Sequence, residues 1–301
     1  MIRSTKKLSV EYFTEFMDAF GYAEEAKEQL TASLKSLIAC DDTRVGIDEI
    51  LEEYRDESFN YNDALKRARN LFPKADVGDY PGCFIFIAHL ASTLRELYKE
   101  KGIPDSIWFD SMCDLKYKAK ECILVKKHWG TFVSSWYSVF FNMSTFALGR
   151  LQFQKRLFDA EFTLDGVELK PDTPALYVHI PRTETPLAPD EVHKSYAMAK
   201  EFFKDSYFKG APCVICCSSW LLFPEHENIL KPESNIRRFM SDFTRVRSGE
   251  TADYTFTWRL FDTEYNGNPD ELPADSSLRR AYIERMKQGL PLGSALGVFI
   301  M

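Results

Sequence analysis

The chain has 301 residues, a net charge of −7 and a charged fraction of 28%. This length fits one large domain or two ordinary ones. The hydrophobic fraction of 45% and the aromatic fraction of 14% supply enough apolar material for a sizeable core. The acidic balance argues against a nucleic-acid-binding protein, which usually carries a basic stripe, and bears more on solubility than on the choice of partner.

The seven cysteines form no even disulfide framework, and most lie inside apolar runs such as Cys83-Phe-Ile-Phe-Ile87. We interpret them as reduced, buried thiols. Cys213 and Cys216 have the spacing of a redox pair. They lie within a strand pattern, however, and lack the helix N-terminus that lowers the pKa of such a thiol. No spacing of His, Cys or carboxylate residues suits a metal ion.

No signal-peptide pattern follows the first residues of the chain. The longest apolar stretches, near residues 83–91 and 131–148, are interrupted by polar residues and are too short to span a bilayer. We therefore expect a cytoplasmic protein with no nucleic-acid or membrane partner.

Residues 1 to about 130 have the periodicity of helices. Ser9 is expected to cap the first helix, whose apolar positions include Phe13 and Phe16, and Gly21 to end it. Further helices are expected at 23–39, 46–56, 60–71, 83–100 and from Pro104 to about Lys127.

The pattern changes near Phe132 to aromatic and β-branched residues. Asp165-Gly166 is a hairpin signal, so residues 146–169 predict an antiparallel pair. The run 175–181 predicts a buried strand, Pro189 to Phe203 an amphipathic helix, and Pro212 to Trp220 a second strand. Strand, helix and strand in this order are typical of a parallel crossover unit.

The rest of the chain predicts a helical region at 224–247, a strand at Asp253–Phe261, a helix at 276–288 capped by Ser276 or Ser277, and a terminal strand at 295–300. The predicted fold class is α+β. An all-helical N-terminal domain, residues 1–145, is followed by a mixed β-sheet flanked by helices, residues 146–301.

Six short sequence motifs lie in order between residues 100 and 240. They are Gly102-Ile-Pro-Asp105, Leu148-Gly-Arg-Leu-Gln-Phe153, His179-Ile-Pro181, Pro186-Leu187 with Pro189, Cys217-Ser-Ser-Trp-Leu-Leu222 and Ser234-Asn-Ile-Arg-Arg-Phe239. With the order of elements, these motifs resemble a bacterial two-domain acyltransferase family that has a helical N-terminal domain and a GNAT-like C-terminal domain.

This resemblance implies acyl-CoA as cosubstrate, held between the strands 175–181 and 212–219. The residues it places at acyl-CoA are Val178, Ile180, Arg182, Thr183 and Asp190, and those it places at the acceptor are Trp220, Asn235 and Arg237. The superfamily carries a glycine-rich loop before the crossover helix. Here residues 182–189 contain no glycine, and Glu184 would repel a phosphate.

The carboxyl ends of the two strands carry the candidate catalytic residues, because ligands bind at such ends in crossover units. His179 is a candidate general base, and Cys217, Ser218 and Ser219 end the next strand. A Cys or Ser beside a His could act as a nucleophile. Direct transfer, substrate positioning and plain packing are the alternatives. Glu161 and Glu184 are alternative bases.

The sequence thus predicts an acyl-CoA-dependent N-acyltransferase in which a small-molecule or peptide amine attacks the thioester directly. The first alternative is a catalytically inactive GNAT-like binding or regulatory module, which the glycine-free loop favours. The second is a helical adaptor with a structural C-terminal half. A slot for the thioester arm requires the two strands to separate toward their carboxyl ends.

Overall fold

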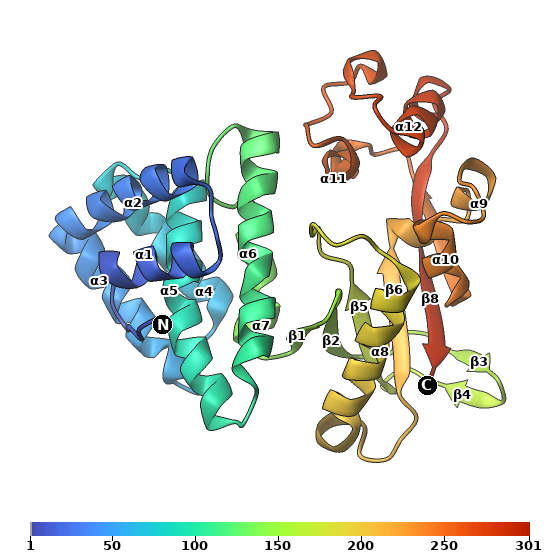
Figure 1. Ribbon diagram of the computed structural model, residues 1–301, viewed down its shortest axis with the longest axis horizontal. Helices are drawn as coiled ribbons and strands as arrows, with labels where there is room; N and C mark the ends of the chain where they lie inside the picture. The colour runs from blue at the N-terminus through green and yellow to red at the C-terminus, as the bar shows by residue number, and fades with distance from the viewer. Residues whose placement is uncertain (1) are drawn as a thin grey trace. The chain divides into compact units, whose positions relative to one another are not determined.

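The computed structural model describes residues 2–301 (Figure 1). The chain divides into two compact units, which meet in sequence between Phe146 and Ala147. The first consists almost entirely of helices, and the second contains a mixed sheet flanked by helices. The predicted α+β fold class is confirmed.

The helices of the first unit follow the predicted ones closely. They are α1 (Val10–Ala19), α2 (Glu24–Ala39), α3 (Asp41–Glu52), α4 (Tyr61–Leu71), α5 (Asp79–Glu100), α6 (Asp105–Lys126) and α7 (Ser138–Phe141). Ser9 caps α1 by accepting a hydrogen bond from the Tyr12 amide. Helix α3 begins earlier than predicted, because Asp41 and Asp42 supply a first turn that suits the positive end of the helix dipole.

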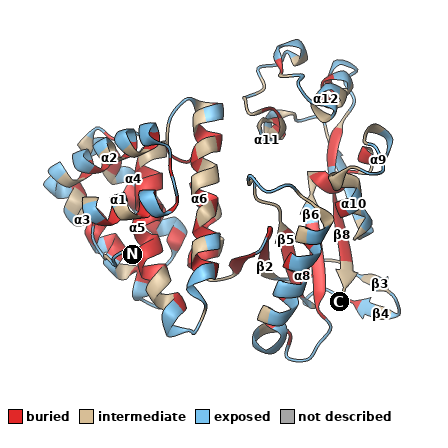
Figure 2. Cartoon of the chain, in the orientation of Figure 1, coloured by how far each residue is buried: buried red, intermediate tan, exposed pale blue. Residues whose placement is uncertain are grey.

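Helix α5 is the core of the first unit, since every residue from Gly82 to Leu94 is buried (Figure 2). A helix that is apolar on all sides belongs in the interior. His89 lies within this run: its Nδ1 donates to the Ile85 carbonyl at 2.7 Å, and its Nε2 accepts from the Ser9 amide at 3.1 Å. Burial lowers the pKa of His89 to about 4.

The main sheet has the strand order β1-β2-β5-β6-β8-β7. Its strands are β1 (Thr145–Leu148), β2 (Leu151–Leu157), β5 (Pro174–His179), β6 (Val214–Ser219), β7 (Thr244–Thr251) and β8 (Leu292–Ile300). Strands β5 and β6 run parallel, whereas β2 with β5, β6 with β8 and β7 with β8 are antiparallel. Helix α8 (Pro189–Phe203) connects β5 to β6, so the predicted crossover unit is confirmed.

The predicted antiparallel pair at 146–169 is in fact two separate pieces. Strands β3 (Phe162–Leu164) and β4 (Val167–Leu169) form a small sheet of their own, whereas β1 and β2 belong to the main sheet. Asp165 and Gly166 both have positive φ, as the turn of a tight hairpin requires.

Two sets of side chains cover the faces of the sheet. On one face α8 packs through its buried residues, and the ring of Tyr196 contacts those of Phe153 and Phe299. On the other face the β3–β4 hairpin closes a cluster that includes Tyr177 and Cys216. Figure 1 shows α8 lying along the sheet, and it shows the β3–β4 hairpin beside the lower end of β8.

The strand predicted at Asp253–Phe261 is wrong. That segment forms a 3-10 turn (Thr255–Thr257) and the short helix α11 (Trp258–Phe261). Asp253 Oδ1 accepts a hydrogen bond from the Thr255 amide, and such local side-chain bonds draw the backbone out of a strand. The apolar alternation of the segment instead serves a local cluster.

The missing strand is β7, whose first half lies in the region predicted as helical at 224–247 and whose second half lies just beyond it. Only α9 (His226–Ile229) and α10 (Asn235–Ser241) are helical there. Strand β7 is an edge strand that is exposed along most of its length and irregular between Arg245 and Arg247, so it lacks the alternating pattern of a half-buried strand.

The C-terminal part ends as predicted. Helix α12 (Ser277–Lys287) is capped by Ser276, which accepts from the Arg279 amide at 3.1 Å, and β8 follows it. Between β7 and β8 the chain builds a second cluster, in which Phe261, Tyr282 and Leu292 are buried. His226 joins it through a 2.6 Å hydrogen bond between its Nε2 and the Tyr282 hydroxyl.

Candidate functional site

Strands β5 and β6 separate toward their carboxyl ends. Their ladder covers only the pairs Leu176↔Ile215 and Tyr177↔Cys216 in the described chain, although β5 continues to His179 and β6 to Ser219. By contrast, β2 and β5 pair over six positions, as do β6 and β8. The outer partners therefore hold both strands while the strands diverge from each other. We call this opening the fork.

His179 forms the tip of β5 on one side of the fork. Its Nε2 lies 3.0 Å from Oε1 of Gln154 on β2, and since an amide oxygen can only accept, Nε2 carries the proton. Burial, and secondarily the charge of Arg156, lower the pKa of His179 to about 4. The imidazole is therefore neutral near pH 7, with Nδ1 unprotonated.

Ser218 lies at the tip of β6, on the same face as His179. In the parallel register Tyr177 lies opposite Cys216, and two residues further along each strand bring His179 level with Ser218. The Ser218 side chain is exposed, whereas that of His179 is half-buried. These two polar side chains stand at corresponding positions of the two diverging strands.

Cys217 and Ser219 point to the other face, toward α8. Cys217 is fully buried, and burial raises the pKa of its thiol far above the usual value. The Ser219 hydroxyl accepts a hydrogen bond from the Leu221 amide at 3.1 Å, which caps a 3-10 turn. Of Cys217, Ser218 and Ser219, the structure thus brings only Ser218 to the face of the sheet that carries His179. Cys217 lies on the face opposite the histidine that was predicted to act as a base.

Arg150 anchors the loop between β5 and α8. Its guanidinium donates to the carbonyls of Pro181 and Thr185, both at 2.9 Å, and its backbone amide donates to the Ser195 hydroxyl of α8 at 2.7 Å. Gly149, at φ 70°, permits this approach, because a Cβ there would lie 2.7 Å from Ser195 Oγ. The dipeptide Gly149-Arg150 therefore holds the loop that precedes α8 in place.

A cavity of about 230 Å³ lies at the N-terminal end of α8. Leu187, Pro189 and Val192 line it from the α8 side, and Arg238 and Phe239 line it from α10. In the described chain no side chain caps the α8 N-terminus. Helix amides and an arginine are donors suited to a phosphate. The acidic first-turn residues of α8 oppose such a ligand.

Arg182 is engaged by the C-terminal segment. Its guanidinium forms an ion pair with Asp262, which also pairs with Arg279 at 2.6 Å. Burial opposes ionisation of Asp262, but hydrogen bonds and charges from the two arginines outweigh it and lower the pKa of that carboxyl. Thr183 donates to the Thr185 carbonyl at 3.0 Å, within the loop.

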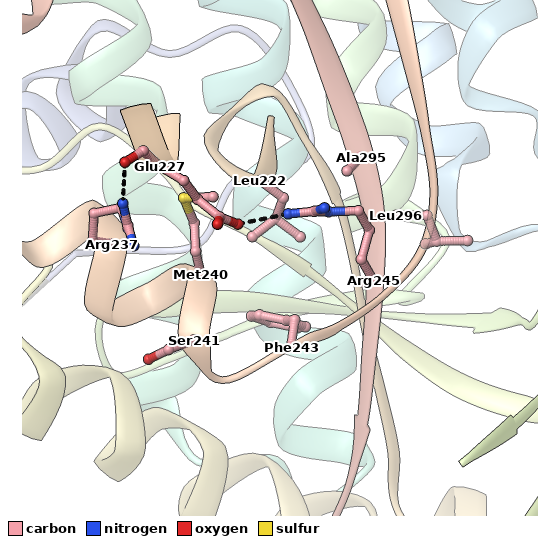
Figure 3. Close-up of a pocket in the computed structure, with 10 residues that line it drawn as sticks. Leu222, Glu227, Arg237, Met240, Ser241, Phe243, Arg245, Ala295 and Leu296 are labelled. Carbon is pink, nitrogen blue, oxygen red and sulfur yellow. Dashed lines mark hydrogen bonds and ion pairs between the residues drawn. The ribbon is translucent and has the colours of Figure 1, made fainter. Parts of the chain in front are cut away.

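The remaining predicted residues lie in different surroundings. Val178 is buried and Ile180 half-buried, on either side of His179, and Asp190 is exposed in the first turn of α8. Trp220 packs edge-on against the rings of His226 and Tyr282, as a core residue does. Asn235 begins α10, and Arg237 lines a separate pocket (Figure 3).

Sequence reasoning missed Gln154 and Asp262 as neighbours of these residues, and it considered Arg237 and Arg238 together as polar groups that enter a helix. The motif Ser234-Asn-Ile-Arg-Arg-Phe239 contains Arg238, but nothing in the pattern shows which arginine faces which cavity. Asp262 lies 80 positions from Arg182, immediately after a segment predicted as a strand. A contact between residues so far apart in the sequence produces no periodic pattern in either segment.

No group of three or more His, Cys, Asp or Glu side chains in residues 2–301 is arranged to hold a metal ion. Nor does that range contain a helix with the length and apolar character needed to cross a bilayer.

The chain is thus an α+β protein with a helical first unit and a mixed sheet flanked by helices. The two central strands of that sheet are parallel, and they diverge at the fork. Sequence profiles identify the class further: a GNAT-like C-terminal domain matches residues 145–299, and an N-acyltransferase N-terminal domain matches residues 11–143. The chain therefore belongs to the N-acyltransferases that combine these two domains. No curated protein matches the sequence.

Solved structures similar to the chain are acyltransferases. One is a mutant acyltransferase, orf11*, in complex with octanoyl-CoA, with a TM-score of 0.72 and 22% identity over 100% of this chain and 90% of that one. Another is an acyltransferase in complex with decanoyl-CoA and teicoplanin, with a TM-score of 0.68 and 23% identity over 99% and 90% of the two chains. At such identities the likeness establishes the fold.

Proposed function

We propose that the chain transfers an acyl group from acyl-CoA to an amine, with the thioester placed in the fork between β5 and β6. The observation that carries this proposal is the two-pair ladder between strands that both continue beyond it. The diverging backbone makes room for the narrow pantetheine arm. Family membership and the acyl-CoA complexes of similar folds support the same donor.

The chemistry needs little from the protein. The amine nitrogen attacks the thioester carbonyl, the C–N bond forms, and the C–S bond breaks to release CoA as its thiol. A proton leaves the nitrogen as the tetrahedral species forms, Nδ1 of His179 is the ring nitrogen that takes it, and the imidazolium then returns it to the departing CoA sulfur. Positioning the two reactants and one proton acceptor accounts for a large share of such a rate acceleration.

The phosphates of CoA would lie at the cavity between α8 and α10. Arg238 takes the place of the glycine-rich loop as the source of donors, together with the first amides of α8. Arg150 occupies the carbonyls of Pro181 and Thr185 by hydrogen bonding to them. The missing glycine is thus offset by a side-chain donor from a neighbouring helix.

The acceptor would be a small-molecule or peptide-like amine. Similar folds have been crystallised with teicoplanin and with 10C-teicoplanin. The low identity to those proteins gives no reason to transfer that acceptor to this chain. An amine on a peptide or small molecule is the chemical class that these observations support.

The decisive experiment is calorimetric titration of the full chain with CoA, acetyl-CoA, octanoyl-CoA and decanoyl-CoA. We expect binding, and a weaker affinity for Arg238→Gln than for Arg280→Gln, a change at an arginine of α12 outside the cavity. No binding at millimolar ligand would exclude the proposal. Binding without acyl transfer to any amine of a diverse panel would favour the inactive binding module.

A further inference from the structure

A second pocket of about 220 Å³ lies between α10, β7 and β8 (Figure 3). Ala295 of β8 lines this pocket and lies opposite Ser219 of β6. Strand β8 neighbours β6 on the side away from β5. The pocket is therefore separated from the fork by β6, and the proposed acyl transfer does not use it.

The rim of this pocket carries two arginines and one glutamate. Arg245 forms an ion pair with the Glu227 carboxylate at 2.8 Å. Arg237 donates to the Glu227 backbone carbonyl at 2.5 Å, and Figure 3 shows both interactions. The rim thus holds two guanidinium groups and one carboxylate, which is paired with Arg245, so its net charge is +1.

Arg237 is the cation without a counter-ion. It is half-buried, and it has no carboxylate within ion-pair distance anywhere in residues 2–301. Partial burial takes water away from a guanidinium, and a neutral carbonyl compensates less well than an anion. A planar guanidinium pairs best with a forked anion such as a carboxylate.

The floor of the pocket is apolar. Leu222, Met240, Phe243 and Ala295 form most of it. Gly297 brings β8 close to the segment that follows α10, because a Cβ there would lie 2.7 Å from Phe243 Cβ. The cavity volume of about 220 Å³ is well above the roughly 10–15 Å³ that a single water molecule requires. A short alkyl chain of comparable size fits.

We propose that this pocket binds a small monocarboxylate with a short alkyl chain, the carboxylate on Arg237 and the chain against the apolar floor. The ligand class is that of a free short-chain fatty acid, of which hexanoate is the probe. This site is distinct from the fork, and it adjoins the cavity at the α8 N-terminus, since Ser241 of α10 lines both.

The test is calorimetric titration of the full chain with butanoate, hexanoate and octanoate, and with hexylamine as the cationic counterpart. We expect hexanoate to bind in the millimolar range and hexylamine not to bind. Arg237→Gln should weaken hexanoate at least tenfold. Glu227→Gln should tighten it several-fold, because the competing carboxylate is lost while the carbonyl that orients Arg237 is retained.

The matched control is Arg238→Gln, on the same helix but lining the other cavity. It should leave hexanoate affinity within about twofold, and a thermal melt of each variant verifies its fold. The titration is repeated with saturating CoA. Unchanged affinity supports a separate site, whereas competition with CoA, no hexanoate binding to the wild type, or equal binding to Arg237→Gln overturns the proposal. A chain that fails to bind CoA still gives the hexanoate result.

Discussion

Two histidines, one in each unit, have a similarly lowered pKa, but they lie in different surroundings. His89 lies in the middle of a buried helix, and His179 lies at the end of a strand. His89 in α5 and His179 in β5 are both held at a pKa of about 4, and burial is the main cause for each. In α5 both ring nitrogens of His89 bond to backbone groups. At the fork, Nε2 of His179 bonds to the amide oxygen of Gln154, a side chain of the neighbouring strand.

The comparison shows that a lowered histidine pKa indicates burial alone. The position of the histidine in its helix or strand indicates whether a ligand could reach it. The histidine in α5 lies in the middle of a helix whose own hydrogen bonds continue through it. The one in β5 stands where its strand loses a parallel neighbour. Of these two positions the second adjoins the fork, so our proposal gives the role of proton acceptor to His179 and a structural role to His89.

The largest expected effect concerns His89 and the stability of the fold. Its folded pKa lies below the ordinary value of about 6.5, so the unfolded chain binds more protons between pH 6.5 and 4. This contribution is complete above about pH 6.5 and declines as the pH falls, by about 1.4 kcal/mol per unit and about 3 kcal/mol in total. Urea unfolding across this range measures the slope.

The matched variant is His89→Gln, which removes the titrating group. Its unfolding free energy should be lower at pH 7, and its loss of stability between pH 6.5 and 4 should be smaller than that of the wild type. An unchanged pH slope would mean that the imidazole titrates normally in the folded state, and the likeness between the two histidines would disappear.

The second effect concerns His179 and turnover. If it takes the proton of the attacking amine, His179→Ala should lower kcat about a hundredfold, equivalent to about 2.7 kcal/mol. The KM for acyl-CoA should change little, since the ring contributes to the transition state. Steady-state kinetics against a reactive amine give both numbers, and Ser218→Ala at the other tip is the comparison. Equal turnover of wild type and His179→Ala would remove this histidine from the mechanism.

The elements that the sequence predicted well are those with a strong internal period. The helices of the first unit and the segment from β5 through α8 to β6 bury one side or all sides, so their apolar spacing reports their structure. Strand β7 was missed because its side chains are mostly exposed. The segment at 253–261 was mistaken for it because its aromatic residues pack into a local cluster.

The candidate site was predicted less completely, for a related reason. His179 could be proposed because a strand end is visible in one stretch of sequence. The face that Cys217 occupies follows from the register between β5 and β6, and the partner of Arg182 comes from a distant segment. Such relations depend on pairing between segments, which a single pattern does not encode.

The third effect concerns the loop before α8 and is smaller. Gly149→Ala places a Cβ 2.7 Å from Ser195 Oγ at a φ of 70°, so we expect a loss of about 2 kcal/mol of stability. The control is Gly166→Ala, at a φ of 80° with nothing within 4 Å of its Cβ. Denaturant unfolding of both variants separates the clash from the backbone strain that they share.

That pair also tests whether the loop shapes the fork. If Gly149 and Arg150 hold the residues that precede α8, Gly149→Ala should weaken acyl-CoA binding, and Gly166→Ala should leave it unchanged. Equal stability of the two variants would show that Ser195 moves aside at no cost. The region around the fork would then be more adaptable than the core around α5.

The smallest expected effect is at Cys217, where the two catalytic alternatives differ most. Covalent transfer through its thiol would require a thiolate, yet burial raises the pKa of this group and its side chain lies on the face opposite His179. Direct attack by the amine requires nothing of it. Cys217→Ala should therefore keep kcat within about threefold of the wild type, the change reflecting the packing of a small buried side chain. Loss of activity with an unchanged thermal melt, or an acyl-enzyme seen by mass spectrometry after mixing with acyl-CoA, would replace direct attack by a two-step transfer. In that case the face toward α8, and not the face that carries His179 and Ser218, would be the reactive side of the sheet.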